Sequence, residues 1–518
     1  MLNCQVIHKT STTITLELQN KACYFAEPAY LLYVNEHFIK KVDKNIVTIS
    51  GLRPHTLYTI RLTSETEHKE WVQQIETTYE TAVLNVRDFG AIGDGEHLDT
   101  QAIQAAIAAA PLGARIVLPP GVYKSTPIFL KSHITLELEE GAILLGDTRR
   151  EAYSILPGVV EKEKEDYYLG FWEGEPVACY ASLVTGICIQ DVKIIGKGII
   201  DGNAQNSDWW VDAKVKRGAW RPRTIYLVDC TAVTIEGITI QNSPSWTIHP
   251  IRCKDMQFIN LSLINPKDSP NTDGINPESS SDIEIVGVRF SLGDDCVAIK
   301  SGKYTLPPER RLASKKITIR NCFMEFGHGA VVIGSEMSGG VKQVKVERCL
   351  FKNTDRGIRI KTRRGRGSTA IIDDIVVKNI KMDGVLTPFT INAFYFCDSD
   401  GKTEYVWSKE KLPRDERTPV IGKLSFENIE CINVQVCAGF IYGLPEEKIQ
   451  SLTFKNISVT FKEDAVPDYP EMLSFQEKIA RTGFVFRNII KLSLEQVSVA
   501  KQLGNPFLVE EVETYNYK

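Results

Sequence analysis

The stretch that decides the fold is VKIIGKGIID (192–201), followed by VTIEGITIQN (233–242), MQFINLSLIN (256–265) and IEIVGVRFSL (283–292). Each run is rich in β-branched residues, alternates apolar with polar side chains and enters a turn rich in Asn, Asp or Gly, as short β-strands do. Six similar runs follow up to residue 500, so that the pattern returns about every 20–35 residues. No helical periodicity lies between the runs, which argues against βαβ folds.

A fixed-period array of short strands without helices predicts a right-handed parallel β-helix, in which each coil buries its apolar residues on its neighbours. A β-propeller is the alternative. Adjacent strands are expected to stack about 4.8 Å apart. Asparagines recur at equivalent turn positions, where we expect left-handed φ angles or side-chain ladders: Asn260, Asn321, Asn379, Asn428 and Asn456.

The array has a distinct beginning. In LNVRDFGAIGDGEHLDTQAIQAAIAAA (84–110), Asp99 or Thr100 can cap a helix that begins near Gln101 and ends at Pro111. Such a helix could cover the exposed end of the solenoid. DFGAIGDG lacks the GxGxxG spacing of a nucleotide-binding loop. We therefore place the β-helix domain at 82–518.

Residues 1–81 have a different pattern, with short alternating strands such as TTITLEL, AYLLYVN and LYTIRL. The segment Leu52–Tyr58 (LRPHTLY) resembles the L-x-P-x-T-x-Y signature of fibronectin type III domains, which implies a β-sandwich in which the Tyr58 hydroxyl bonds the nearby backbone. Any other small β-sandwich is the alternative. This domain shows no catalytic cluster, so we expect a spacer or docking role.

Composition limits the function. The 518 residues carry a formal net charge of -4, which argues against general nucleic-acid binding. No apolar run approaches the roughly 20 residues of a membrane span, and the first ten residues lack the apolar core of a signal peptide. The 12 cysteines are dispersed, form no CxxC motif and often lie in apolar runs. Free thiols, and hence a cytoplasmic location, are expected.

Acidic and basic residues gather in four turns of consecutive repeats: Asn271-Thr-Asp273, Gly293-Asp294-Asp295, Gly327-His328-Gly329 and Arg359-Ile-Lys361. The steps from Asp273 to Asp294, His328 and Arg359 are 21, 34 and 31 residues, each about one coil. If the strands are in register, the turns lie side by side over roughly 14 Å. A groove of this length suits a short stretch of sugar chain.

These motifs, with GDDCVAIKSG, GHGAVVIGSE, RGIRIKT and the upstream DFGAIGDG and IIDG, resemble in order and spacing the motif set of glycoside hydrolase family twenty-eight, the polygalacturonases. The resemblance covers about residues 83–500. It implies inverting hydrolysis of α-1,4-linked galacturonate, with Asp294 as general acid, Asp273 and Asp295 holding and deprotonating the water, and His328 supporting the protonation of the acid. Inversion normally needs carboxyl groups roughly 6.5–9.5 Å apart, and crowded carboxylates raise at least one pKa.

Arg359 and Lys361 are two residues apart on a predicted strand, so they point to one face and favour a uronate over a neutral sugar. The resemblance places them around the carboxylate on the leaving-group side, where Tyr395 can pack on the sugar. His249 is expected to contact the other side, and Asn271 to orient the site or touch the substrate. No metal or other cofactor is implied, and the partner is a pectic oligo- or polysaccharide.

Several residues have alternative interpretations. The aspartates could be turn residues or calcium ligands, as in pectate lyases that share this solenoid. His328, Arg359 and Lys361 could be structural or solvated groups, and the six basic residues between 356 and 366 could contact nucleic acid. Trp209, Trp210 and Trp220 could belong to the core, although their polar loop favours stacking on sugar or walling off the groove.

Long insertions at 147–180, 203–222 and 388–418 interrupt the coils. Long loops in compact folds are usually functional. An insertion that blocks one end of the groove would admit only a chain end, so we expect exo-action that releases galacturonate or digalacturonate. The competing functions are a rhamnogalacturonan or xylogalacturonan hydrolase, a calcium-dependent lyase and a non-catalytic carbohydrate-binding solenoid.

Overall fold

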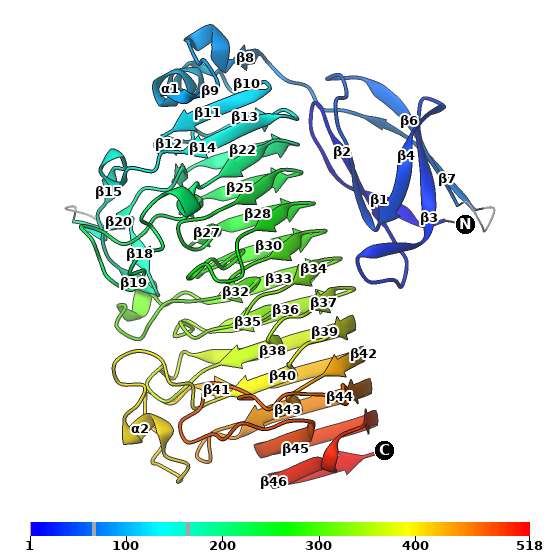
Figure 1. Ribbon diagram of the computed structural model, residues 1–518, viewed down its shortest axis with the longest axis vertical. Helices are drawn as coiled ribbons and strands as arrows, with labels where there is room; N and C mark the ends of the chain where they lie inside the picture. Colours follow the sequence, from blue (N-terminus) through cyan, green and yellow to red (C-terminus); the bar gives the residue numbers. More distant parts are fainter. Residues whose placement is uncertain (1, 65–68, 162–165) are drawn as a thin grey trace.

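The computed structural model describes residues 2–64, 69–161 and 166–518. It shows a long parallel β-helix with a small antiparallel unit beside its first half (Figure 1), so the predicted all-β fold is confirmed. The helical segments of the described chain are short: α1 (Thr100–Ala109), α2 (Glu404–Trp407), η1 (Val86–Phe89), η2 (Arg150–Ala152), η3 (Ala204–Asn206) and η4 (Pro308–Arg310). No helix in the described ranges has the length and apolar character that a membrane crossing requires.

The solenoid has three faces, each a ladder of parallel strands. Face 1 is the longest, and its strands are β8 (Val83–Asn85), β10 (Ala114–Leu118), β13 (Ile134–Leu138), β22 (Gln190–Gly196), β25 (Thr231–Glu236), β28 (Lys254–Ile259), β30 (Ser281–Val286), β33 (Ser314–Arg320), β36 (Val341–Glu347), β39 (Ile371–Asp383), β42 (Lys423–Val434), β44 (Ile449–Phe461), β45 (Thr482–Ala500) and β46 (Leu503–Tyr517).

Faces 2 and 3 complete each coil. Face 2 consists of β9 (Asp94–Leu98), β11 (Gly121–Ser125), β14 (Ala142–Gly146), β23 (Ile199–Asp201), β26 (Thr239–Gln241), β29 (Ser262–Ile264), β31 (Arg289–Ser291), β34 (Phe323–Glu325), β37 (Leu350–Lys352) and the end of β39. Face 3 consists of β12 (Ile128–Phe129), β21 (Val184–Ile187), β24 (Ile225–Val228), β27 (Ile248–Ile251), β32 (Val297–Ile299), β35 (Val331–Ile333), β38 (Arg356–Lys361), β40 (Thr387–Asn392), β43 (Cys437–Tyr442) and the start of β45.

The predicted asparagine positions explain how the coils turn. All five have φ between 50° and 56°, in the left-handed region that Asn tolerates best among non-glycine residues. Along the later coils they also form a ladder, because the Asn456 amide donates to Asn428 (2.8 Å) and the Asn428 amide donates to Asn379 (3.1 Å). Both expectations for these turns are therefore confirmed.

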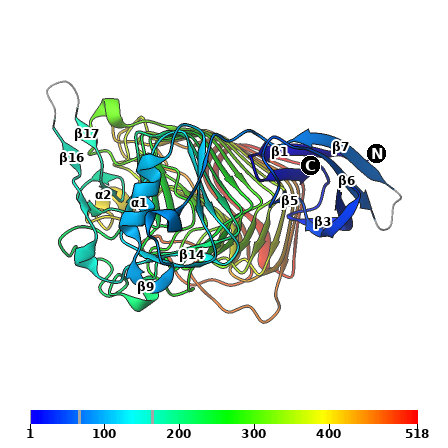
Figure 2. The ribbon, with the colours of Figure 1, turned by 90° about the horizontal axis from the view of Figure 1, so that it is seen from above.

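The first coil is covered by α1, as the end view in Figure 2 shows. Ile103 and Ile107 of this helix are buried against the solenoid core. Asp99 occupies the N-cap position but makes no side-chain cap; its carboxylate instead accepts the backbone N–H groups of Ile92 (2.7 Å) and Gly93 (3.0 Å). The predicted helix is present, and Asp99 holds the GAIGDG turn against it.

The N-terminal unit consists of two antiparallel sheets. One contains β1 (Cys4–Lys9), β2 (Ile14–Leu18) and β5 (Ile46–Ile49); the other contains β3 (Phe25–Val34), β4 (His37–Lys44), β6 (Leu57–Ser64) and β7 (Glu70–Glu76). The Tyr58 hydroxyl accepts the backbone N–H of Arg53 at 2.8 Å, as predicted. The assignment to the fibronectin type III class stays a prediction.

A buried polar network joins this unit to the solenoid. The fully buried Glu17 carboxylate accepts hydrogen bonds from Arg320 (3.0 Å), Arg348 (2.6 Å) and Asn321 (2.9 Å). A second buried carboxylate, Glu236, accepts the hydroxyl of Thr13 at 2.9 Å. These contacts dock the unit firmly on the solenoid.

The insertions lie on the opposite side of the solenoid from the N-terminal unit, in both Figure 1 and Figure 2. The first, 147–180, includes residues 162–165, which lie outside the described ranges. The short strands of this insertion are β15 (Ile155–Leu156), β16 (Val159–Val160), β17 (Tyr167–Tyr168), β18 (Phe171–Trp172), β19 (Glu175–Pro176) and β20 (Cys179–Tyr180). Another short strand, β41 (Val420–Ile421), follows the third insertion.

Candidate active site

Three aspartates converge at the edge of face 3. Asp294 and Asp295 occupy the turn before β32, and Asp273 lies one coil earlier, where the Asp295 backbone carbonyl accepts the Gly274 N–H at 3.0 Å. One oxygen of each carboxylate lies within 4.8 Å of the others. Asp273 and Asp295 are buried, whereas the Asp294 side chain is 21% exposed. The structure therefore brings together the three predicted carboxylates, with Asp294 the most accessible.

Burial and neighbouring charge favour the protonated form of Asp273. Burial raises its pKa well above the usual value, and the nearby charges of Asp294 and Asp295 raise it further against the opposing effect of Lys300. The amide of Asn276 donates to its Oδ2 at 2.8 Å. Crowding thus raises one pKa, as predicted, but in Asp273 and not in the expected acid Asp294.

His328 explains why Asp294 differs. Its Nδ1 lies 3.3 Å from Asp294 Oδ1, and this hydrogen bond raises the pKa of His328 to about 9. Burial alone would raise the pKa of Asp294, but the hydrogen bond and charge of His328 outweigh it and lower that pKa. At neutral pH the two side chains therefore form an ion pair in which the imidazole carries the proton.

The glycines around His328 allow this close approach. Gly327 has φ +134°, and a Cβ there would lie 2.7 Å from the Asp294 carbonyl oxygen. A Cβ on Gly329 would lie 2.4 Å from Val332 and 3.1 Å from Asp295 Oδ1. Side chains at either position would push the His328 turn away from the aspartates.

The predicted cationic pair lies beside Asp295 and is already engaged. Lys361 Nζ is 2.9 Å from Asp295 Oδ2, and Arg359 Nη1 is 3.7 Å from Asp295 Oδ1. The rest of the Arg359 guanidinium donates twice to Glu471, including Nε to Oε2 at 2.8 Å. Glu471 lies between β44 and β45, outside every motif, and sequence analysis missed it because its partner is 112 residues away.

Three weaker predictions have different outcomes. Tyr395 is buried next to the cationic pair. Its ring centroid lies 5.7 Å from Arg359 Cζ and 5.5 Å from Lys361 Nζ, and its hydroxyl contacts the Met472 sulfur. Asn271 accepts a hydrogen bond from Arg221 at 2.6 Å, so it supports the wall of the site.

His249 does not face the groove. It is fully buried, pairs with Glu278 at 2.9 Å and lies against Trp246, and burial lowers its pKa to about 4. The expected contact of His249 with substrate is corrected to a neutral structural role, because no part of the side chain is exposed.

An aromatic wall stands beside Asp273. Trp172 stacks on Trp220 (ring centroids 4.8 Å apart, 3°) and on Trp246 (6.0 Å, 9°). The adjacent Thr247 N–H donates to the Asp273 carbonyl at 2.8 Å. Sequence analysis missed Trp172 and Trp246, whose stack joins insertion 147–180 to the coil before Asp273.

The other predicted tryptophans contribute less. Trp209 is fully buried against Tyr153 and Tyr180, so its expected sugar contact was wrong and it belongs to the core. Trp210 is held through its indole N–H, which donates to the Ser243 carbonyl at 3.0 Å.

Among the described residues, Asp273, Asp294 and Asp295 form the cluster whose spacing could hold a cation. The protein already supplies positive charge there. Lys361 contacts Asp295, His328 contacts Asp294, and the charge of Lys300 acts on Asp273. A hard divalent cation such as calcium would have to compete with these groups for the carboxylates, so the site fits acid–base chemistry better than calcium binding.

Comparisons with known proteins agree with this geometry. The family described as "Glycosyl hydrolases family 28" matches residues 172–409, and "Rhamnogalacturonase A/epimerase, pectate lyase-like" matches 83–150. A probable polygalacturonase of Vitis vinifera is 31% identical over 382 residues, which cover 72% of this chain and 73% of that protein.

Solved structures give the same result. The exopolygalacturonase of Thermotoga maritima has a TM-score of 0.65 and 26% identity over 81% of this chain and 91% of that chain. The family 28 exopolygalacturonase of Yersinia enterocolitica has a TM-score of 0.74 over 100% of this chain and 98% of that chain, and its 19% identity supports the fold alone. Fold, sequence similarity and the clustered aspartates together show that this chain belongs to glycosyl hydrolase family 28.

Proposed function

We propose that this chain is an exo-acting polygalacturonase that hydrolyses α-1,4-galacturonosidic bonds and releases galacturonate or digalacturonate. The observation that carries the proposal is the cluster of three carboxylates within 4.8 Å, flanked by His328, Arg359 and Lys361. Carboxylates supply the acid and base of glycoside hydrolysis, and nearby cations suit an anionic sugar. The family and its polygalacturonase members support this substrate class.

In the proposed reaction, the proton that His328 carries passes to Asp294, and Asp294 delivers it to the leaving oxygen. It is the most exposed of the three carboxylates, and its pair with His328 holds one proton. Asp273 and Asp295 hold the attacking water. Asp295 takes the proton that the water loses, because burial raises the pKa of Asp273 and favours its protonated form, which is the poorer acceptor.

Inversion requires room for that water. The nearest carboxylate oxygens lie within 4.8 Å of one another, closer than the roughly 6.5–9.5 Å typical of inverting enzymes. Two hydrogen bonds of about 2.8 Å can still join one water to two oxygens at this distance. We therefore keep the inverting mechanism in the proposal, with the water bridging Asp273 and Asp295.

Exo-action is supported by the wall beside Asp273. Trp172, Trp220 and Trp246 form a stacked layer, and Arg221 links this layer to the turn of Asp273 through Asn271 and the Pro270 carbonyl. The hairpin that carries Trp172 also contacts a later coil, where the Lys303 N–H donates to the Gly174 carbonyl at 3.3 Å. We propose that this wall closes one end of the groove, which would then admit only a chain terminus.

Sized products of polygalacturonate digestion test the proposal. Monomer or dimer should accumulate from the first time points while viscosity falls slowly, and early mixed oligomers with a fast viscosity drop would reject exo-action. Parallel assays on rhamnogalacturonan and xylogalacturonan test the two rival substrates. Unsaturated products would instead indicate a lyase, and binding without turnover would indicate a non-catalytic solenoid.

We also propose that the enzyme works in a reducing compartment, the cytoplasm, on short imported oligogalacturonates. All 12 cysteines lie in the described part of the chain and all are free thiols. Reducing compartments keep such thiols unpaired. Fractionation of the source cells tests this location, and recovery of the enzyme outside the cytoplasm would reject it.

A further inference from the structure

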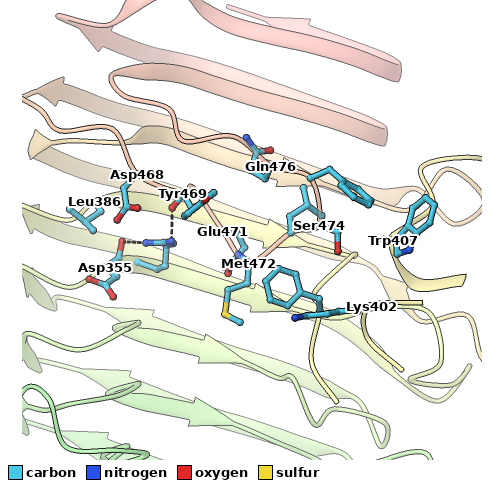
Figure 3. Close-up of a pocket in the computed structure, with 14 residues that line it drawn as sticks. Asp355, Leu386, Lys402, Trp407, Asp468, Tyr469, Glu471, Met472, Ser474 and Gln476 are labelled. Carbon is cyan, nitrogen blue, oxygen red and sulfur yellow. Dashed lines mark hydrogen bonds between the residues drawn. The ribbon is translucent and has the colours of Figure 1, made fainter. Parts of the chain in front are cut away.

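We propose that the groove leads into an additional pocket that binds a galacturonate residue further along the leaving-group side, one sugar beyond the residue next to the cleaved bond. The inference rests on the proposed hydrolysis of galacturonan. The pocket has a volume of about 630 Å³, within the roughly 300–1,000 Å³ of small-molecule sites. Its walls come from the turns before β38 and β40, from insertion 388–418, and from residues 462–481, here called the covering segment (Figure 3).

The pocket is continuous with the catalytic turns. Successive turns before the strands of face 3 carry Asp294, His328, Asp355 and Leu386, and the last two line the pocket. The Asp355 N–H donates to the Gly327 carbonyl at 2.9 Å, so the pocket begins one coil beyond His328. A sugar chain that leaves the aspartates along this row therefore enters it.

The covering segment is held across the coils at several points. Arg356 donates to the Tyr469 carbonyl at 2.7 Å, Arg359 pairs with Glu471, and Asn392 donates to the Met472 carbonyl at 2.9 Å. Figure 3 shows Glu471 and Met472 between Asp355 at one end and Trp407 at the other. These bonds preform the pocket, so little ordering is needed when a sugar binds.

Two aromatic rings at the far end offer a surface for a sugar ring. Phe475 and Trp407 meet edge to face, with centroids 5.3 Å apart. Phe475 is 84% exposed and has φ +64°, a left-handed conformation that is rare for a bulky residue. Phe475 stays open to solvent despite its contact with Trp407, and an exposed aromatic face on a pocket wall is typical of ligand sites.

One cation in the pocket is available for a uronate carboxylate. Lys402 is exposed near Phe396, with its Nζ 5.7 Å from that ring, and no carboxylate in the described part of the chain lies within ion-pair distance of it. Two acids that line the pocket already have partners, because Glu471 pairs with Arg359 and Asp468 with Lys478 at 3.3 Å. Lys402 therefore favours galacturonate over a neutral sugar.

Chain-length dependence tests the pocket. When galacturonate is the unit released, digalacturonate spans the cleaved bond alone, whereas trigalacturonate also reaches the pocket, so wild-type kcat/KM should be higher on the trimer. In Phe475→Ala and in Lys402→Ala the trimer-to-dimer ratio should fall about fivefold to tenfold, and Phe475→Tyr should restore it. Phe38→Ala, which removes a 58% exposed ring from the N-terminal unit, is the matched control and should keep the wild-type ratio.

Calorimetry in an Asp294→Asn background provides a readout without turnover. Trimer should bind more tightly than dimer, and the Phe475 and Lys402 variants should remove that difference. Equal binding of the two oligomers, or an unchanged ratio in both variants, would overturn the pocket. Tight chain-length-dependent binding by a wild-type protein that cleaves neither oligomer would overturn the proposed function and leave the pocket standing.

Discussion

Arg359 and Glu471 form a buried two-pronged ion pair between face 3 and the covering segment. Arg359 lies in β38, and Glu471 reaches it from 112 residues later in the chain. Burial alone would raise the pKa of Glu471, but the charge and hydrogen bonds of Arg359 outweigh it and lower the pKa to about 2. The covering segment is therefore anchored by the same guanidinium that approaches Asp295.

This pair should make stability sensitive to acid. A carboxylate with a depressed folded pKa stabilises the protein fully above its unfolded pKa of about 4.5, and the contribution disappears as pH falls towards 2. The shift corresponds to a contribution on the order of 3 kcal/mol to the free energy of unfolding.

We expect Glu471→Gln to destabilise the protein at pH 7 and to weaken the loss of stability on acidification, measured by urea unfolding at several pH values. Glu36→Gln, at a 69% exposed side chain, is the control; the same pH dependence in wild type and Glu471→Gln would contradict the assignment.

His328 should set the alkaline limit of activity. Its pKa of about 9 keeps the imidazole protonated below that pH, and the proton is lost as pH rises through it. Activity should therefore fall near pH 9, and His328→Gln should remove this limb while lowering kcat. In Asp294→Asn the NMR titration of His328 should move towards the ordinary value near 6.5, since the hydrogen bond that raises it is weakened. An unmoved titration would show that the pair does not form.

The same Asp294→Asn change should remove the general acid of the reaction. We expect kcat to fall by at least 100-fold, the lower end of what general acid catalysis contributes, while trigalacturonate binding is largely kept. Unchanged turnover would reject Asp294 as the acid.

The stereochemistry of the product tests the position of the water. An α-linked substrate attacked by water held between Asp273 and Asp295 should first yield the β-anomer. Proton NMR in the first minutes, before mutarotation, measures this ratio. The carboxylate oxygens lie within 4.8 Å, so an initial α-anomer would indicate a covalent intermediate on one of the aspartates.

Removing Glu17 should destabilise the chain far more than removing an exposed acid. Glu17→Ala leaves Arg320 and Arg348 without their buried partner, a change that typically costs about 3–5 kcal/mol. Glu36→Ala breaks an exposed pair with Arg61 and should cost at most about 1 kcal/mol. Thermal unfolding and limited proteolysis of the N-terminal unit measure both. Equal effects would show that the network does not hold the two parts together.

Removal of divalent cations by a chelator should leave the hydrolytic activity unchanged. Lys361 and His328 contact two of the clustered carboxylates, so the protein supplies the positive charge that a calcium ion would otherwise provide. Activity after EDTA treatment, with and without added calcium, is the measurement. A loss that calcium restores would support the lyase alternative.

The repeats and turn residues were enough to predict the β-helix, the helix that covers its end and the convergence of three aspartates. These features depend on local patterns, because strand period and turn chemistry are set by neighbouring residues. Asn379, Asn428 and Asn456 show this directly, since each has the left-handed φ that its turn position predicted. The spacing of the motifs likewise predicted that the turns of Asp294 and His328 would lie side by side.

By itself, the sequence determined the solenoid, and motif spacing of about one coil predicted that Asp273, Asp294 and His328 would lie side by side, while their acid–base roles are what the family resemblance implies. Only the tertiary structure decided that His249 and Trp209 are buried, that Asp273 rather than Asp294 has the raised pKa, and that Glu471 engages Arg359. The reason is physical: burial and pKa depend on groups brought together from distant coils and insertions. No local pattern encodes which long-range partner reaches a given side chain.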